Sequence, residues 1–170
     1  ARTSKYDNLL RYEGYELILK ILRYLYQIDA YISIAEVARE RGFVFAEALP
    51  LGGNILEIEG MFHPLIENAI PNSIQADAEH NVVFLTGANM AGKSTFMKTF
   101  GIVVYLAHMG FPLPVKKMRF SVQNGMYTTI NLPDNMMLGY SHFYAEVQRL
   151  KKVAEQVGRI GNLVIVFDAL

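Results

Sequence analysis

The sequence predicts an α/β fold in which a parallel sheet with flanking helices is preceded by an N-terminal helical segment. Three observations predict it. Residues 82–86 (VVFLT) form a short apolar run that suits a strand buried on both faces. A glycine-rich loop and an apolar helix follow at once, and a second apolar run at residues 163–167 (LVIVF) ends in Asp168. A strand, a loop, a helix and a later apolar strand that ends in an acid are typical of a parallel α/β sheet.

Composition narrows the class of protein. A chain of 170 residues with 52% hydrophobic residues predicts one globular domain, or a domain with an appendage. Acidic and basic residues balance at 16 each, so any contact with DNA has to be local. The absence of cysteine excludes disulfides, thiol catalysis and zinc–thiolate sites. No apolar run reaches the ~18 residues of a membrane span, and the N-terminus does not resemble a signal peptide, so a cytoplasmic protein without membrane contact is expected.

The N-terminal part is predicted to be helical over residues 1–42. Apolar residues recur at helical spacing and line one face of a helix. They are Leu10, Leu17, Ile21, Leu25 and Ile28. A second helical stretch is expected at residues 33–41, with Gly42 as its stop. The chain therefore divides into a helical segment, residues 1–42, and a core, residues 43–170.

The remaining elements of the core follow in order. A short strand is expected in ILEIEG (residues 55–60), and strand and loop at residues 61–81. Residues 94–109 predict an apolar helix that Gly110 ends, and residues 119–130 alternate as strands do. A further amphipathic helix is predicted from the spacing of Tyr144, Val147, Leu150, Val153 and Val157. The core is expected to be truncated directly after its last strand, residues 163–167.

The glycine-rich loop predicts a phosphate site. Gly87 and the run Gly92, Lys93, Ser94 match the P-loop pattern G-x-x-x-x-G-K-[ST] in full, which predicts a sheet of the P-loop NTPase type. Glycines let backbone N–H groups approach phosphate oxygens, and the start of the following helix reinforces them. Lys93 adds a full positive charge, and the Ser94 hydroxyl is an expected ligand of Mg²⁺. Asp168, at the end of an apolar strand, is expected to hold the same ion through water. ATP and Mg²⁺ are therefore the predicted cofactors.

Several segments together resemble the MutS family of mismatch-repair ATPases. TGANMAGKST (residues 86–95) is similar to the family's TGPNMGGKST, and DNMMLGYSHFYAEV (residues 134–147) to its D-D-L-x-x-G-x-S-T-F-x-x-E-M element. GMFHPLIE, HMGFPLPV and QIDAYISIAEVA also resemble family segments, so that the resemblance covers most of residues 26–170. It implies an ABC-like sheet and a lever or connector role for residues 1–42.

The resemblance also implies roles for single residues. Asn89 and Met90, with Ala91 and Thr95 beside them, correspond to loop positions around the β- and γ-phosphates. Ser141 matches a serine that approaches the nucleotide of the opposite subunit in family dimers. Ala69 stands where the family often has an aromatic residue that packs on the adenine, so Ile70 and Pro71 are expected to supply an aliphatic wall instead. His63 and Pro64 match a pair beside the nucleotide-binding core. Glu146 matches a family acid whose role is uncertain. Read from the residues alone, His63 is a turn histidine and Ser141 a helix N-cap, and both alternatives stay open.

The departures from the family pattern bear on catalysis. Family members read L-L-D-E, in which the glutamate activates water, whereas this chain reads VFDAL, so Ala169 stands at the glutamate position and no catalytic residue is assigned. Ala91 replaces a loop glycine, which costs on the order of 1 kcal/mol only if that residue needs φ > 0. Thr129 replaces an arginine, and His142 a threonine.

Three functions are compatible with these residues. The first is the ATP-binding domain of a MutS-like DNA mismatch-repair protein, which dimerises across the nucleotide and couples ATP binding and hydrolysis to clamping of mismatched or branched DNA by the whole protein. The alternative is a hydrolysis-deficient nucleotide-binding switch, and the third is a fragment that merely inherits the loop. Phosphate release in a single turnover separates the first two, and binding of an ATP analogue tests the third. The 170-residue chain itself is expected to bind nucleotide weakly and to turn over negligibly.

Overall fold

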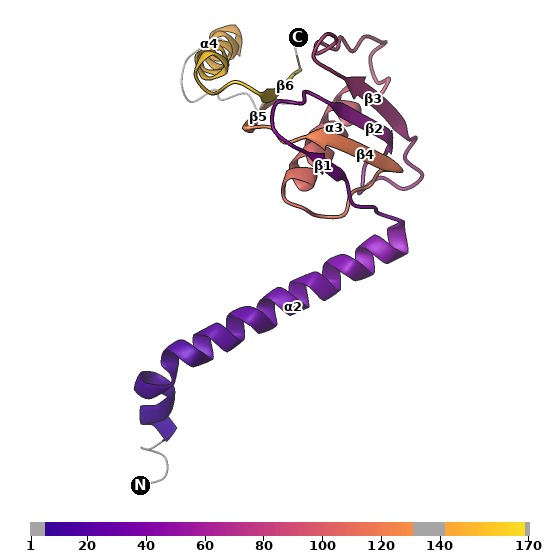
Figure 1. Cartoon of the computed structure of the whole chain (residues 1–170). Helices are drawn as coiled ribbons and strands as arrows, with labels where there is room; N and C mark the ends of the chain where they lie inside the picture. Colours follow the sequence, from indigo (N-terminus) through magenta and orange to yellow (C-terminus); the bar gives the residue numbers. More distant parts are fainter. Residues whose placement is uncertain (1–5, 131–141, 169–170) are drawn as a thin grey trace. The chain divides into compact units, whose positions relative to one another are not determined.

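The computed structural model describes residues 6–130 and 142–168 (Figure 1). By its internal contacts the chain divides into two compact units, Ala1–Gly42 and Phe43–Leu170. Each unit is described by itself below. Among the described residues, no helix has both the length and the apolar character that a bilayer crossing needs.

The first unit is helical. A short π-helical turn, η1 (Leu9–Glu13), precedes the long helix α2 (Tyr15–Arg41), which is continuous where the sequence predicted two stretches. The predicted end is confirmed, because Gly42 takes a left-handed conformation (φ 67°) and its N–H donates to the carbonyl of Ala38. No residue of α2 is buried, so its apolar side chains stay accessible within this unit.

The second unit contains a mixed four-stranded sheet. Its strands are β1 (Glu47–Leu49), β2 (Leu56–Met61), β3 (Asn72–Ala76) and β4 (Lys117–Ser121). They lie in the order β1-β4-β2-β3, with β1 parallel to β4 and the other two pairs antiparallel. The strand expected in ILEIEG is therefore confirmed as β2.

A second, two-stranded sheet pairs β5 (Gly125–Thr129) in parallel with β6 (Leu163–Phe167). Two helices accompany the sheets, α3 (Lys93–His108) and α4 (His142–Ile160). Both helices and the strand β6 lie where the sequence predicted them, α3 from its apolar residues before Gly110, α4 from helical spacing and β6 from its apolar run. The strand β6 is less buried than predicted, since only Val166 is fully enclosed.

The prediction of a P-loop NTPase-type (ABC-like) sheet is wrong. The described residues form two short sheets, and residues 82–86, expected as a central strand, pair with no other strand. Val82 is 70% exposed and Phe84 88% exposed. The physical reason is that an apolar run only favours a buried strand, whereas a strand exists through hydrogen bonds to its neighbours. Here β6 pairs with β5, and residues 82–86 belong to no strand.

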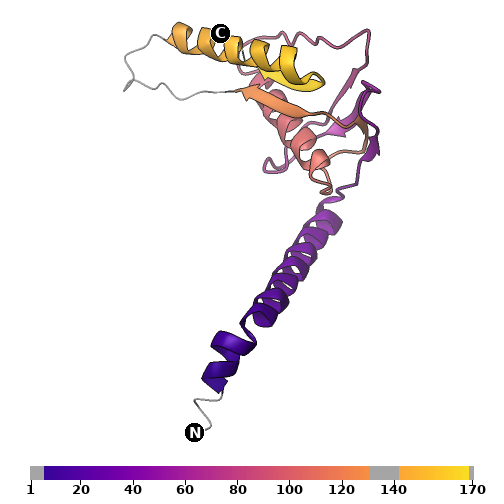
Figure 2. The ribbon, with the colours of Figure 1, turned by 60° about the vertical axis from the view of Figure 1, so that its left-hand side comes forward.

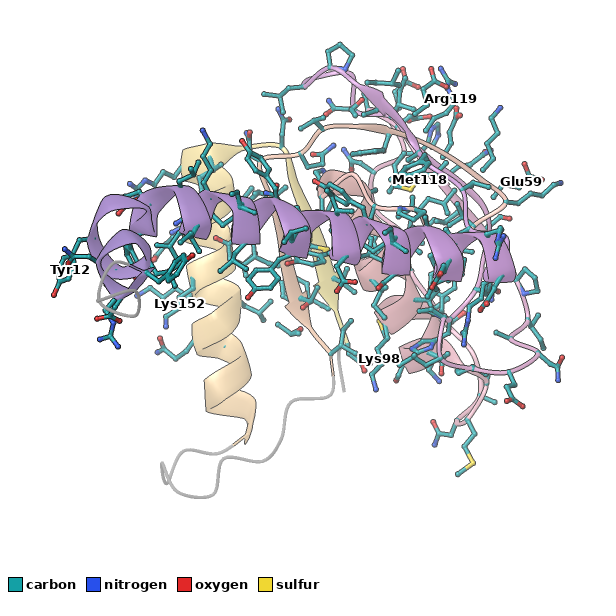
Figure 3. The ribbon with its side chains drawn as sticks, turned by 90° about the horizontal axis from the view of Figure 1, so that it is seen from below. Tyr12, Glu59, Lys98, Met118, Arg119 and Lys152 are labelled. Carbon is teal, nitrogen blue, oxygen red and sulfur yellow. The ribbon has the colours of Figure 1, made fainter. Side chains whose placement is uncertain are left out.

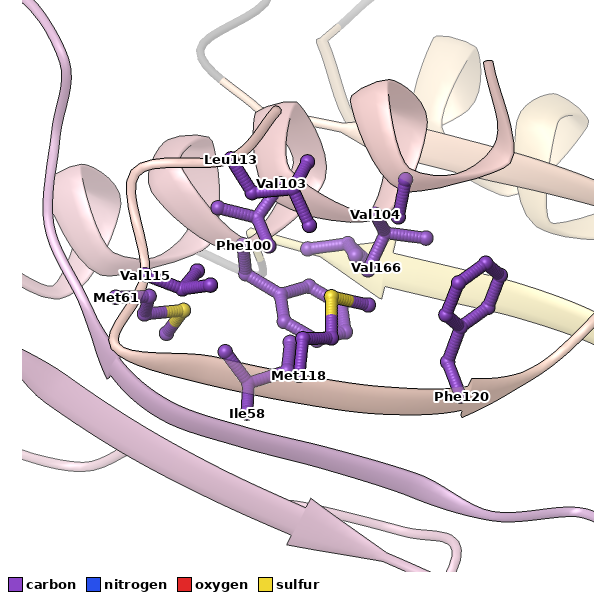
Figure 4. Close-up of a cluster of buried hydrophobic side chains, with 11 residues drawn as sticks. Ile58, Met61, Phe100, Val103, Val104, Leu113, Val115, Met118, Phe120 and Val166 are labelled. Atoms are coloured by element: carbon purple, nitrogen blue, oxygen red, sulfur yellow. The ribbon is translucent and has the colours of Figure 1, made fainter. Parts of the chain in front are cut away.

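Helix α3 lies between the two sheets and forms most of the core with them (Figure 1 and Figure 2). Figure 4 shows Phe100, Val103 and Val104 of α3 directed at Ile58 of β2 and Met118 of β4. The same cluster includes Val166 of β6, and Gly101 leaves room for Thr128 of β5, whose methyl group lies 3.9 Å from the position of an added Cβ. One helix therefore covers apolar side chains of both sheets.

Asn124 fixes where β5 and β6 begin to pair. Its side-chain amide donates to the carbonyls of Ile160 and Gly161 at 3.3 Å each, which caps the end of α4. Its backbone N–H donates to the carbonyl of Asn162 at 2.8 Å. These three bonds join the end of α4, the start of β6 and the connection between β4 and β5. They set the register that carries Asp168 to its place at the far end of β6.

Ion pairs cross the solvent-facing side of the four-stranded sheet. Arg119 of β4 bonds Glu47 of β1 at 3.0 Å and Glu57 of β2 at 3.1 Å, and these acids are its direct neighbours in the sheet register. Lys116, directly before β4, forms an ion pair with Glu59 of β2, whose register partner is Lys117. Figure 3 labels Arg119 and Glu59 on this sheet. Opposite charges placed across neighbouring strands favour this register over one shifted by a residue.

The Glu59–Lys116 pair predicts a pH-dependent contribution to stability. The hydrogen bond and the charge of Lys116 lower the pKa of Glu59 below its ordinary value of 4.5. A lowered folded-state pKa stabilises the fold above pH 4.5, and this contribution is lost as the pH falls through the lower pKa of the folded state. We expect urea midpoints of the wild type and Glu59→Gln to differ slightly at about pH 6 and to converge near about pH 3, because exposed pairs contribute little.

The matched control is Glu67→Gln, which makes the same chemical change on an exposed glutamate outside the sheet. It should leave the midpoint unchanged across that pH range. A difference between wild type and Glu59→Gln that does not depend on pH would contradict the ion-pair explanation.

Candidate functional site

The glycine-rich loop (residues 87–95) leads directly into α3. Gly92 is the N-cap of the helix, with φ 90°, and no side chain caps the first turn. The Phe96 N–H donates to the Gly92 carbonyl at 2.8 Å, so that the helical ladder begins there. The first N–H groups of any helix have no partner inside it, and together with the helix dipole they attract an anion. The loop therefore has the backbone of an anion site at the start of a helix, although not after a paired strand.

The tip of the loop is formed by Asn89 and Met90, which make a turn and are exposed. Met90 has φ 65°, a left-handed conformation that is unusual for a residue with a side chain. Ala91 is not among the described residues with positive φ, and its N–H donates to the Ala88 carbonyl at 3.2 Å. Alanine at position 91, where the resemblance implies glycine, therefore adds little conformational strain to the backbone.

The Lys93 ammonium lies over the loop. Its Nζ donates to the carbonyl of Gly87 at 2.7 Å and to that of Ala88 at 2.9 Å. These bonds close a ring from the helix start back to the first residues of the loop. A cation held in this position adds a full charge to the partial positive charge of the helix terminus.

Ser94 and Asp168 meet although they are 74 residues apart in the chain. The Ser94 hydroxyl donates to Oδ2 of Asp168 at 3.3 Å, and the contact is partly buried. Asp168 is held in turn by its own N–H, which donates to the Thr129 carbonyl at 3.0 Å as the last rung of the β5–β6 pairing. The first turn of α3 and the end of β6 thus bring a hydroxyl and a carboxylate together beside the loop.

Thr129 is the contact that sequence reasoning missed. The sequence shows Thr129 only as a replacement for an arginine, whereas its carbonyl, not its side chain, positions Asp168. The alternating pattern of residues 125–129 indicated a strand, but the pattern alone does not give its partner or register. The other loop residue, Thr95, is exposed, and its carbonyl accepts a bond from the Thr99 hydroxyl at 2.7 Å.

Other predicted residues have contacts elsewhere or lie outside the described part of the chain. Ile70 is 83% exposed in the connection between β2 and β3, where its carbonyl accepts a bond from the Asn72 side chain at 2.9 Å. The His63 ring accepts the Leu65 N–H at 3.3 Å, as a turn histidine does, and Pro64 follows it. Ser141 and Ala169 lie outside the described residues. Glu146 lies within α4.

The rest of the described chain offers weaker candidates. Within residues 6–130 and 142–168, no three histidine or acidic side chains converge in a way that could bind a metal. A surface depression elsewhere, on the four-stranded sheet, contains no loop residue and is occupied by the ion-pair side chains. Its lining residues are Glu57, Ile58, Glu59, Ser73, Gln75, Lys117 and Arg119. Of these lining side chains, Arg119 and Glu57 pair with each other and Glu59 pairs with Lys116. The loop with Ser94 and Asp168, which matches the phosphate pattern of the sequence, is the better candidate site.

Comparison with known proteins identifies the family. Residues 83–170 match the family model of MutS domain V, which is the C-terminal region of MutS. The DNA mismatch repair protein MutS of Thermus aquaticus is 31% identical over 156 residues, and that of Desulforamulus reducens is 32% identical over 160 residues. DNA mismatch repair protein MutS 1 of Halobacterium salinarum is 33% identical over 134 residues.

These matches cover most of this chain and a small part of each relative. They include 90% of the chain for the first two relatives and 77% for the third. The chain spans 18% of the length of the first two relatives and 15% of the third. The family match and the identities agree with the resemblance that the sequence motifs indicated. The chain belongs to the MutS family.

Proposed function

We propose that this chain is the ATP-binding part of a MutS-like DNA mismatch repair protein, and that it holds ATP with Mg²⁺ at the glycine-rich loop, Ser94 and Asp168. The observation that carries the proposal is the 3.3 Å contact between the Ser94 hydroxyl and the Asp168 carboxylate. The sequence predicts Ser94 as a metal ligand from the loop pattern, and Asp168 because it ends an apolar strand downstream of that loop. The two residues come from elements far apart in the chain.

The phosphate contacts follow from the loop. The unpaired amides at the start of α3, with Gly92 as N-cap, favour a group that carries several anionic oxygens. Lys93 can exchange its two carbonyl partners for phosphate oxygens, and charge-assisted bonds to phosphate are stronger than bonds to neutral carbonyls. We infer that Asn89 and Met90, which are exposed in a turn at the tip of the loop, approach the β- and γ-phosphates.

The residues also suit Mg²⁺. This ion prefers oxygen ligands, and in nucleotide sites it takes one or two groups from the protein and the rest from phosphate and water. Ser94 would bind the ion directly, and Asp168 would bind it through water. One hydroxyl and one carboxylate are within the one or two protein groups that Mg²⁺ takes in nucleotide sites. When bound, Mg²⁺ neutralises charge on the β- and γ-phosphates. The Thr129 carbonyl contributes by keeping Asp168 at the end of β6.

Contacts beyond the loop belong to the whole protein. The relatives are named DNA mismatch repair proteins, and we infer that mismatched or branched DNA is bound by the complete polypeptide. We also infer a dimer in which Ser141 approaches the nucleotide of the partner, with Ile70 beside the adenine. Since Ala169 has no carboxylate, we infer ATP binding rather than turnover for this chain. Phosphate release in a single turnover by the chain with Ala169 would contradict that part.

The metal pair gives the test of the proposal. We expect Mg²⁺ to strengthen the binding of a fluorescent ATP analogue to the wild type. In Ser94→Ala and in Asp168→Asn the Mg²⁺-dependent part of the affinity should fall by about 10- to 100-fold, as for other changes to metal-binding residues. Because both residues serve one ion, the double variant should lose little more than either single variant. The measurement is an equilibrium titration with and without Mg²⁺.

Asp77→Asn provides the control. The Asp77 carboxylate accepts the N–H groups of Glu79 and His80 in an exposed turn, so that this variant removes the same charge elsewhere in the chain. It should bind the analogue as the wild type does. The proposal fails if Mg²⁺ strengthens binding equally in the wild type and in both site variants.

A further inference from the structure

We propose that Met90 is an oxidation site that regulates the glycine-rich loop, so that conversion of its thioether to the sulfoxide weakens the binding of a triphosphate. The effect on binding rests on the proposed function, whereas the site of oxidation can be tested without it. The Met90 side chain is fully exposed, at 105%.

The other methionines described by the structure are less accessible. Met61 and Met118 are 1% and 2% exposed within the core, and Met109 is 52% exposed after α3. The chain contains no cysteine, so methionine is its only sulfur-containing residue type. Among the described residues, an oxidant in solution therefore reaches the sulfur of Met90 most readily.

The backbone keeps the side chain accessible. Met90 lies at the tip of the loop with φ 65°, in a turn with Asn89. The neighbouring bond from the Ala91 N–H to the Ala88 carbonyl closes the turn at 3.2 Å. The long Met90 side chain therefore projects into solvent from a constrained backbone, and no core packing has to open before an oxidant can approach it.

The reaction needs only a hydroperoxide. A lone pair of the thioether sulfur attacks one oxygen of hydrogen peroxide, the O–O bond breaks and an S–O bond forms. The departing hydroxide takes up the remaining proton as water. Sulfur loses two electrons and the peroxide gains two, which gives methionine sulfoxide and one water.

The product changes the chemistry of the loop. The sulfoxide oxygen is a hydrogen-bond acceptor, whereas the thioether is a very weak one. Met90 is two residues from Gly92 and three from Lys93. A flexible side chain of this length can reach hydrogen-bond donors on residues so near to it in the sequence. The new oxygen can therefore compete with phosphate oxygens for the free amides of the helix start and for the Lys93 ammonium.

The site is tested by peptide mapping of the full chain after graded treatment with hydrogen peroxide. We expect Met90 to be oxidised faster than Met109 and at least about tenfold faster than Met61 or Met118, because exposure controls access to the sulfur. Oxidation of Met90 at the rate of the two buried methionines would overturn the proposal.

The effect is tested by titrating the oxidised and untreated chains with the fluorescent ATP analogue. Oxidation should weaken binding about fivefold, the value of one competing hydrogen bond, and methionine sulfoxide reductases should restore it. Peroxide should not change the affinity of Met90→Leu for the analogue. In the matched variant Met109→Leu, peroxide should weaken binding about fivefold, as in the wild type. Unchanged affinity after complete oxidation of Met90 would overturn the proposal. If the untreated chain binds no analogue, the proposed function fails, and with it the regulatory effect, while the mapping still decides the oxidation site.

Discussion

Replacing Lys93 by alanine is expected to weaken binding of the ATP analogue by about 10- to 150-fold, which corresponds to the ~1.5–3 kcal/mol of hydrogen bonds to charged groups. The ammonium lies within hydrogen-bond distance of the Gly87 and Ala88 carbonyls, over the loop that would hold the phosphates. In the variant the loop keeps its backbone donors but loses its full positive charge. Equilibrium titration of the wild type and the variant measures the difference.

Lys98→Ala is the matched control for this prediction. Lys98 is exposed on the same helix, outside the loop, and is labelled in Figure 3. Its removal changes the net charge of the chain by the same amount and should leave affinity within about twofold, since exposed charges contribute little at physiological salt. Equal weakening by both substitutions would show that net charge, not the position of Lys93, governs binding. Thermal unfolding of each variant should verify that the chain stays folded.

The largest loss of stability is expected from Phe100→Ala, at about 3–5 kcal/mol in the free energy of unfolding. The Phe100 ring is 8% exposed and lies in the cluster that joins α3 to both sheets (Figure 4). Truncation removes the transfer free energy of the ring and leaves a cavity that Ile58 and Met118 cannot fill without moving. Urea denaturation followed by circular dichroism measures the change.

Phe45→Ala tests whether burial is the cause. Phe45 is 71% exposed outside the core cluster, so that the same truncation should change the free energy of unfolding by no more than about 0.5 kcal/mol. A similar loss in both variants would mean that the cluster around α3 is not the source of the stability. In that event the role assigned to α3 in the fold would be wrong.

Local patterns in the sequence predicted the elements that local interactions form. The apolar residues before Gly110 located α3, and helical spacing located α4. Gly42 ends α2 because a left-handed residue closes a helix readily when it has no Cβ. The apolar run at β6 and the acid after it were also found. For the candidate site, the loop pattern selected Lys93 and Ser94 before their contacts were visible.

Pairing between strands could not be predicted in the same way. Residues 82–86 have the composition of a buried strand, yet they are exposed and belong to no strand, because composition does not supply a neighbouring strand. The approach of Ser94 to Asp168 depends on the β5–β6 register that Asn124 sets, and no single segment encodes it. The apolar face of α2 was predicted correctly as a periodic pattern, but periodicity does not say what covers that face.

The position of α3 between the sheets makes the second unit cooperative. Phe100, Val103 and Val104 supply buried contacts to side chains of both sheets. When the helix detaches, the apolar faces of both sheets therefore become exposed to water. Partial opening of one sheet alone therefore has little chance to persist, and amide protons of β4 and β6 should exchange with solvent through the same rare opening event. A ligand that holds the first turn of α3 in place would slow that event for both sheets at once.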